Sequence, residues 1–175
     1  MGKGPSGEFG TGLPLTQIND GKKVIKMQQL GATMHSLGIR FGYYDTKDWK
    51  AARYCDPIVD TWGDIANTTA GAIFAPADKQ PEMFEKLVGV CNKFSGLIEK
   101  TLAHHGGKYM AGSKMTIADF VVASYAGNYV MNAKCPIAPA LQANLTNTPK
   151  LKAYIDARET TFPYLKARGE FQTPF

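Results

Sequence analysis

The stretch of residues 115–131 constrains the fold of this chain more than any other part of the sequence. It contains Thr-Ile-Ala-Asp at positions 116–119, which fits the Ser/Thr-x-x-acid pattern of a helix capping box. The residues that follow, 120–131, are apolar on nearly every side of the expected helix. Because a helix that is apolar all round has to be buried, other helices must surround it. We therefore expect Thr116 and Asp119 to have a structural role, and Asp119 not to be a catalytic acid.

Two long segments with a helical period can supply the surrounding helices. Residues 80–105 carry an apolar stripe with helical spacing, and residues 46–74 form another helical stretch that Thr46 or Asp48 can cap. Pro57 lies inside the second stretch, so that helix either kinks there or restarts with Asp56 as its cap. Shorter helical segments are predicted over residues 27–42, about 139–145 and 149–161.

A β-hairpin near the start of the chain is the only convincing strand signal. Leu13–Ile18 is a short run of apolar and β-branched residues, and a second run, Lys23–Lys26, follows a turn that contains Asp20 and Gly21. The glycine-rich residues 1–12 precede it. The sequence thus predicts a mainly α fold, in which a hairpin and one helix lead into an all-helical bundle.

Composition narrows the classes of function. The net charge of +5 comes from basic residues that are scattered along the chain, so we expect no nucleic-acid partner. No apolar run reaches the length of a membrane-spanning helix, so we expect no membrane insertion. The three cysteines lack metal-site spacing, which favours a reducing, cytoplasmic compartment and no bound metal.

The order of these elements resembles a cytosolic glutathione S-transferase that begins partway through its first domain. The resemblance rests on four ordered stretches and on the ending, residues 149–175, which is similar to that of the sigma, mu and pi classes. It implies a partial thioredoxin-like domain over residues 1–45, reduced to a hairpin and a helix, and a C-terminal all-helical domain over residues 46–175. The four stretches are residues 12–21, 27–42 (MQQLGATMHSLGIRFG), 55–65 (CDPIVDTWGDI) and 107–120 (GKYMAGSKMTIADF).

The resemblance implies that the catalytic group is missing. In the family, a tyrosine or serine near the end of the first strand stabilises the glutathione thiolate, which is the nucleophile. The strand–helix–strand unit that carries it has no counterpart here, and Tyr43 and Tyr44 lie on the wrong element. We therefore expect no catalytic residue in this sequence.

Parts of a glutathione site remain by resemblance. Leu13 matches the residue that offers its backbone to glutathione, before a cis-proline that matches Pro14; the alternative is an ordinary strand-edge proline. The family's Gln-Ser pair corresponds to Gln29 and Leu30, or to Gln28 and Gln29, and in either register the serine is lost. Ordinary surface glutamines are the alternative interpretation.

Three aspartates, Asp56, Asp60 and Asp64, repeat every four residues along one helix face. By resemblance, Asp64 matches the aspartate that reaches across the family's dimer toward the glutathione amine. The alternatives are a hard-cation site, which Gly63 weakens because relatives carry an acid there, and a solvated acidic face.

These expectations combine into a hypothesis about function. We expect a glutathione transferase-like protein that is non-catalytic and acts as a structural or interaction subunit. A protein partner, in a homodimer or larger complex, would cover the open edge of the Leu13–Ile18 strand. Glutathione is the only small ligand expected. The alternatives are an active transferase whose start is missing from the sequence, and a scaffold used for binding or storage.

Overall fold

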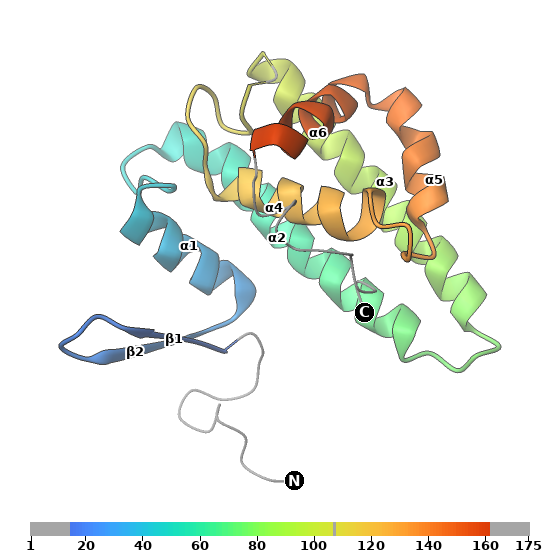
Figure 1. Cartoon of the computed structure of the whole chain (residues 1–175), viewed down its shortest axis with the longest axis horizontal. Coiled ribbons are helices and arrows are strands. Elements are labelled where there is room, and N and C mark those ends of the chain that lie inside the picture. Colours follow the sequence, from blue (N-terminus) through green and yellow to red (C-terminus); the bar gives the residue numbers. More distant parts are fainter. Residues whose placement is uncertain (1–14, 107, 162–175) are drawn as a thin grey trace, which may run out of the picture.

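The chain forms a helical bundle with a two-stranded hairpin at one side (Figure 1). The computed structural model describes residues 15–106 and 108–161. The mainly helical fold class with a preceding hairpin and helix is confirmed. The strands are β1 (Leu15–Asn19) and β2 (Val24–Gln28), and the helices are α1 (Leu30–Phe41), α2 (Trp49–Ile73), α3 (Gln80–His104), α4 (Ile117–Tyr125), the π-helical turn η1 (Ala126–Val130), α5 (Ala138–Asn144), the 3-10 turn η2 (Leu145–Asn147) and α6 (Pro149–Thr161).

Helix α4 is the buried centre of the bundle, as its apolar sequence predicts. Val122 and Tyr125 of α4 have no exposed surface. The ring of Tyr125 meets the ring of Phe94 edge-on with their centres 5.2 Å apart, and its hydroxyl forms a hydrogen bond of 2.9 Å with Ser95. These contacts attach α4 to α3, and α4 also packs along α2.

The capping box at the start of α4 also connects this helix to other segments. The carboxylate of Asp119 accepts the backbone N–H of Thr116 at 2.7 Å and the Thr116 hydroxyl at 2.9 Å. It also accepts the backbone N–H of Met110 at 3.2 Å and the hydroxyl of Tyr154 in α6. Asp119 is fully buried, so this one carboxylate joins α4, the loop before it and α6.

Helix α2 is continuous through its proline. Asp48 caps its first turn by accepting the backbone N–H of Ala51 at 3.0 Å, and Pro57 lies inside the helix. The alternative prediction of a second helix restarting with Asp56 as its cap is therefore wrong. The carboxylate of Asp56 is instead used in contacts with α1.

The hairpin has the expected turn. Asn19 pairs with Val24, and the turn between the strands contains Asp20, whose carboxylate accepts the backbone N–H groups of Lys22 and Lys23 at 2.9 Å each. Gly21 has a φ of +86°, a conformation that glycine adopts without strain. The residues of the predicted first strand before Leu15 lie outside the described part of the chain.

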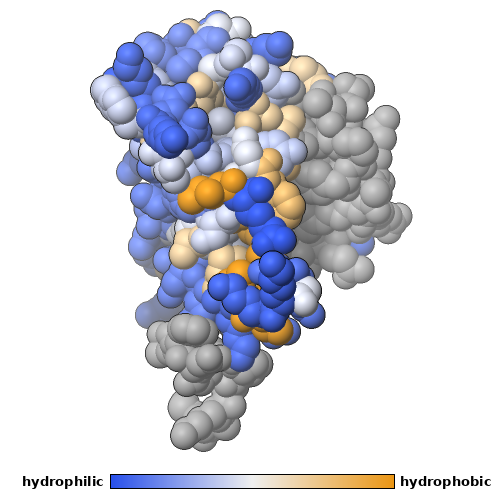
Figure 2. Space-filling model, turned by 90° about the vertical axis from the view of Figure 1, so that its left-hand side faces the viewer, coloured by the Kyte–Doolittle hydropathy of each residue, from blue (hydrophilic) through white to orange (hydrophobic). Residues whose placement is uncertain are grey.

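Helix α1 carries the hairpin on the bundle. It contacts β2 on one side and α2 and α4 on the other, so the hairpin projects from the bundle beyond α1 (Figure 1). Figure 2 looks onto this side of the molecule and shows hydrophobic side chains at the surface among hydrophilic ones. Exposed apolar side chains on the hairpin and α1 are Val24, Ile39 and Phe41.

The predicted domain boundary falls in the loop between α1 and α2. The division at residues 45 and 46 stays a prediction, because α1 is packed on the helices that follow it. Within residues 15–106 and 108–161, no helix combines the length and the apolar character needed to cross a membrane.

Replacing the buried capping aspartate should destabilise the fold far more than replacing the exposed one. Asp119→Ala leaves several buried donors without an acceptor, at about 1–3 kcal/mol each, so we expect a loss of at least about 3 kcal/mol. Asp48→Ala removes one exposed cap and should cost about 1 kcal/mol. Urea unfolding followed by circular dichroism measures both, and equal losses would contradict the central role of Asp119.

A second substitution tests how closely α1 sits on the bundle. A Cβ atom on the buried Gly38 would lie 2.5 Å from Cγ2 of Ile117 and 2.9 Å from Cβ of Tyr44. Gly38→Ala should therefore lower the melting temperature. Gly89→Ala is the matched control, because open space surrounds that helical glycine and alanine favours helix by about 1 kcal/mol; its melting temperature should stay level or rise.

Candidate functional site

The junction between β2 and α1 holds the only strained backbone among the described non-glycine residues. Gln29 has φ 68° and ψ 138°, and it immediately precedes Leu30, the first residue of α1. Such a conformation costs about 1–3 kcal/mol and concentrates at functional sites. Gln28 ends β2 and is half-buried, whereas the side chain of Gln29 is exposed. Two residues of the predicted glutathione-site remnant, Gln28 and Gln29, belong to this junction.

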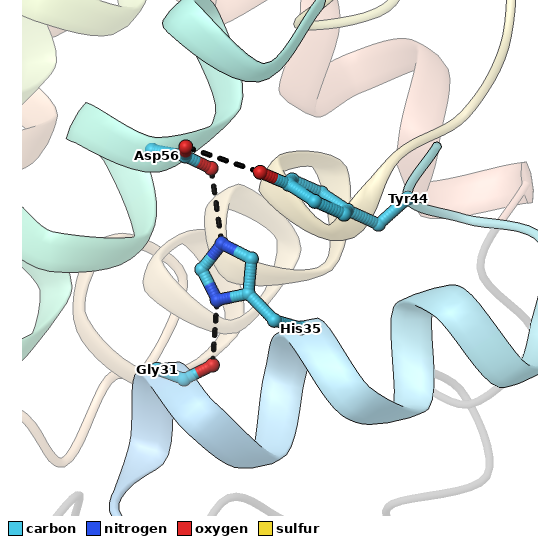
Figure 3. Close-up of polar contacts among 4 residues, drawn as sticks. All are labelled: Gly31, His35, Tyr44 and Asp56. Carbon is cyan, nitrogen blue, oxygen red and sulfur yellow. Dashed lines mark hydrogen bonds and ion pairs between the residues drawn. The ribbon is translucent and has the colours of Figure 1, made fainter. Parts of the chain in front are cut away.

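A polar cluster next to this junction joins α1 to α2 (Figure 3). Nε2 of His35 lies 3.0 Å from Oδ1 of Asp56, and the Tyr44 hydroxyl donates to Oδ2 of the same carboxylate at 3.1 Å. Nδ1 of His35 lies 2.7 Å from the carbonyl oxygen of Gly31. The rings of His35 and Tyr44 meet edge-on, with centres 4.6 Å apart.

The partners of His35 determine its charge. A carbonyl oxygen and an ionised carboxylate only accept hydrogen bonds, so His35 makes both bonds when its imidazole is protonated and both ring nitrogens donate. Burial opposes this charge, but the hydrogen bonds to Asp56 and Gly31 and the negative charges of Asp56 and Asp60 outweigh burial and raise the pKa of His35. The cluster is therefore a charged link between two helices.

Tyr44 is held protonated by the same cluster. Burial, followed by the hydrogen bond to Asp56 and the charge of that carboxylate, raises the pKa of Tyr44 to about 12. Its hydroxyl proton is directed to Asp56. This arrangement holds the Tyr44 hydroxyl on the Asp56 carboxylate.

The three aspartates of α2 do not act as one site. Asp56 binds α1 through His35, and Asp60 approaches the first turn of α1, with its Oδ1 4.0 Å from the position of a Cβ on Gly31. Asp64, one turn further, is exposed. Within residues 15–106 and 108–161, no three His, Cys, Asp or Glu side chains are arranged to hold a metal ion.

The roles predicted for the remaining site residues stay predictions. Leu13 and Pro14 lie outside the described residues, so their predicted contact with glutathione stays a prediction, as do the roles of Gln28, Gln29 and Asp64. Sequence reasoning missed His35. The sequence shows a histidine within the helix predicted over residues 27–42. It does not show which element that side chain faces.

The link between His35 and Asp56 should make stability depend on pH. The pKa of His35 is raised in the folded protein, so its contribution is fully present below about pH 6.5 and disappears as the pH rises through the raised pKa. With 28% of the His35 and 40% of the Asp56 side chain exposed, we expect at most about 1 kcal/mol.

Urea unfolding of the wild type and of His35→Gln across this pH range measures the effect. The difference in unfolding free energy should shrink with rising pH, and Asp56→Asn should behave like His35→Gln. The matched control is Asp64→Asn, which changes an exposed aspartate of the same helix and should keep the wild-type profile. A difference that does not change with pH would show that His35 is not a charged link.

Comparisons with known proteins agree with this fold. Residues 63–161, more than half of the chain, match the model of the glutathione S-transferase C-terminal domain. A glutathione S-transferase of Gallus gallus is 25% identical over 162 residues, covering 89% of this chain and 71% of that protein.

Two solved structures show the same fold. The sigma class glutathione transferase of Fasciola hepatica matches with a TM-score of 0.66 at 16% identity, over 93% of this chain and 76% of that one. Glutathione transferase YghU of Streptococcus pneumoniae, solved in complex with glutathione, matches with a TM-score of 0.68 at 18% identity, over 92% of this chain and 62% of that one. The buried α4 with its capping box, the hairpin and helix before the bundle, and the match over more than half the chain lead to one conclusion: this chain belongs to the glutathione S-transferase family.

Proposed function

We propose that this glutathione transferase-like protein works by associating with another protein chain, and that it does not itself conjugate glutathione. The observation that carries the proposal is the outer edge of β1. In the described part of the chain β1 pairs with β2 alone. A two-stranded hairpin is marginal in water, and an open strand edge is a template for pairing with another chain.

A groove on the same side of the bundle supports the proposal. It lies between α1 and α4, has a volume of about 300 Å³ and is almost entirely apolar. Phe41 at its border is 64% exposed. Apolar surface of this kind is a common mark of a protein interface. The groove is lined by Met34, Leu37, Gly38, Phe41, Tyr43, Ile117 and Phe120.

The chemistry of the β2–α1 junction supports the absence of conjugation by the described residues. In one register of the resemblance Leu30 stands at the serine position, and a leucine cannot donate a hydrogen bond to a carboxylate. In the other register Gln29 stands there, and the serine hydroxyl is again lost. The nearby Tyr44 hydroxyl is bonded to Asp56. The Tyr44 hydroxyl is therefore already used by Asp56 and is not free to stabilise a thiolate.

An active transferase that conjugates glutathione to electrophiles is the second candidate. The strained backbone of Gln29 favours it, because such strain persists where function requires it. The Streptococcus pneumoniae relative binds glutathione in its crystal. In this alternative Leu13, Pro14, Gln28, Gln29 and Asp64 would contact glutathione. A cytoplasmic, reducing location belongs to either candidate, and all three cysteines are unpaired and buried.

The position of Gln17 allows a test that leaves the hairpin intact. The backbone N–H of Asp20 donates to the carbonyl of Lys23. Bonded and non-bonded pairs alternate along an antiparallel ladder, so the pair of Gln17 with Lys26 is non-bonded. The N–H of Gln17 then faces the outer edge, and Gln17→Pro blocks this edge without removing a bond to β2.

The tagged full chain is purified from the cells that produce it. Mass spectrometry identifies the proteins that remain bound to it, and light scattering gives the mass of the complex and thus the ratio of its chains. We expect a second copy or another protein with the wild type and a loss of at least tenfold in binding, about 1.4 kcal/mol, with Gln17→Pro and with Phe41→Ser. Ile39→Ser is the matched control, because Ile39 is 51% exposed on α1 and does not line the groove.

The same preparation is tested for retention on immobilised glutathione and for turnover of a chlorinated aromatic substrate. We expect no turnover above the uncatalysed rate. A monomer that conjugates glutathione would overturn the proposal and favour the active transferase. Association that Gln17→Pro and Phe41→Ser leave unchanged would show that the partner binds elsewhere.

A further inference from the structure

We propose a second binding site, for an organic phosphate with a flat ring, between the start of α2 and the end of α3. A cavity of about 380 Å³ lies there, lined among others by Trp49, Lys50, Arg53, His104 and His105. This volume falls within the range of small-molecule pockets and exceeds the needs of a single inorganic ion. The inference is independent of the proposed function.

The polar groups in this cavity are held in place by one another. The guanidinium of Arg53 lies over the ring of Tyr54, 4.5 Å from its centre, and donates to the Tyr54 hydroxyl. The same hydroxyl forms a 2.6 Å hydrogen bond with Nε2 of His104. The ring of His105 packs edge-on against Tyr54, with centres 4.4 Å apart. A ligand would therefore meet donors that are already oriented.

The electrostatics of the cavity favour an anion. Lys50 and Arg53 bring positive charge, whereas the only acid in the lining, Asp48, uses a carboxylate oxygen to cap α2. Burial, followed by the charges of His104 and Arg53, lowers the pKa of His105, and the smaller of these causes place positive charge next to that ring.

His105 has a buried nitrogen that lacks a hydrogen-bond partner in the described part of the chain. Nε2 of His105 is buried and has no hydrogen-bond partner within the described residues. Buried polar atoms in proteins are nearly always paired, so such an atom calls for an explanation, such as a ligand or water. Because this nitrogen has almost no exposed surface, a ligand in the cavity would reach it only after the His105 ring turned toward the cavity.

The donors indicate a phosphate, and Trp49 indicates a ring. A guanidinium and an ammonium group together suit the several oxygens of a phosphate. Trp49 is 66% exposed at the cavity, and an indole offers a flat surface on which an aromatic ring stacks. A nucleoside monophosphate combines both features.

The site is separate from the β2–α1 junction. Tyr54 precedes Asp56 by two residues, and residues two apart point to nearly opposite sides of an α-helix. Asp56 faces α1, whereas Tyr54 faces the histidines at the end of α3. Binding at this cavity therefore does not depend on an intact glutathione site.

Fluorescence of Trp49 tests the proposal in the full chain. The chain has two tryptophans, so Trp62→Phe leaves Trp49 as the reporter. We expect a saturable change with adenosine monophosphate, and binding at least about tenfold weaker, or 1.4 kcal/mol, for adenosine and for inorganic phosphate. No saturable change with adenosine monophosphate up to about 10 mM, or equal affinity for all three probes, would overturn the proposal.

Substitutions locate the binding. Arg53→Gln should weaken adenosine monophosphate binding at least about tenfold, because a charge-assisted bond is lost. Arg40→Gln is the matched control, since Arg40 is an exposed arginine on α1, and its affinity should stay unchanged. Because Arg53 also holds Tyr54, Lys50→Gln serves as a second variant at an exposed side chain and should weaken binding severalfold. Unchanged affinity in both Arg53→Gln and Lys50→Gln would overturn the proposal, with melting temperatures showing that each variant is folded.

Discussion

The buried carboxylate of Asp119 is the interaction on which the arrangement of this molecule depends. It accepts hydrogen bonds from the loop before α4, from the first turn of α4 and from Tyr154 of α6. A buried carboxyl group is costly to leave without hydrogen-bond partners, so these bonds favour the observed arrangement of the three segments. The backbone N–H of Ile117, inside this turn, donates to the carbonyl of Tyr43 at 3.1 Å. The same turn therefore also fixes the loop that follows α1.

Further contacts connect this turn to α1, and α1 in turn contacts the hairpin. The close approach of Gly38 to Ile117 and the charged link between His35 and Asp56 hold α1 on α4 and α2. The hairpin has contacts with α1 but stands beyond the bundle (Figure 1). The hairpin therefore depends on its contacts with α1 for stability, because two strands alone bury too little surface to be stable. Gln29 lies between the hairpin and α1, and both of them hold it in its strained conformation.

The sequence allowed the local features to be predicted and left the long-range pairings open. The capping box at Thr116, the hairpin turn at Asp20 and the long helices follow from patterns within a few residues, and each is present in the structure. The π-helical turn at residues 126–130 was not predicted, since a period measured over so few residues does not distinguish it from an α-helix. The pairing of His35 with Asp56 joins residues that are 21 positions apart, and only the packing of α1 on α2 brings them together. For Pro57 the sequence left two alternatives open, and the helix proved to be continuous.

Membership of a family fixes the scaffold but not the chemistry of each site. In this chain, buried residues such as Asp119 and Tyr125 hold the scaffold together. The helix that supports the β2–α1 junction is α2, and the opposite side of the same helix start carries Arg53 and Tyr54. A single rigid helix thus presents two chemically different surfaces, one acidic toward α1 and one basic toward the end of α3. Because a helix holds its side chains at fixed angles, a substitution on one of these surfaces leaves the side-chain geometry of the other surface in place.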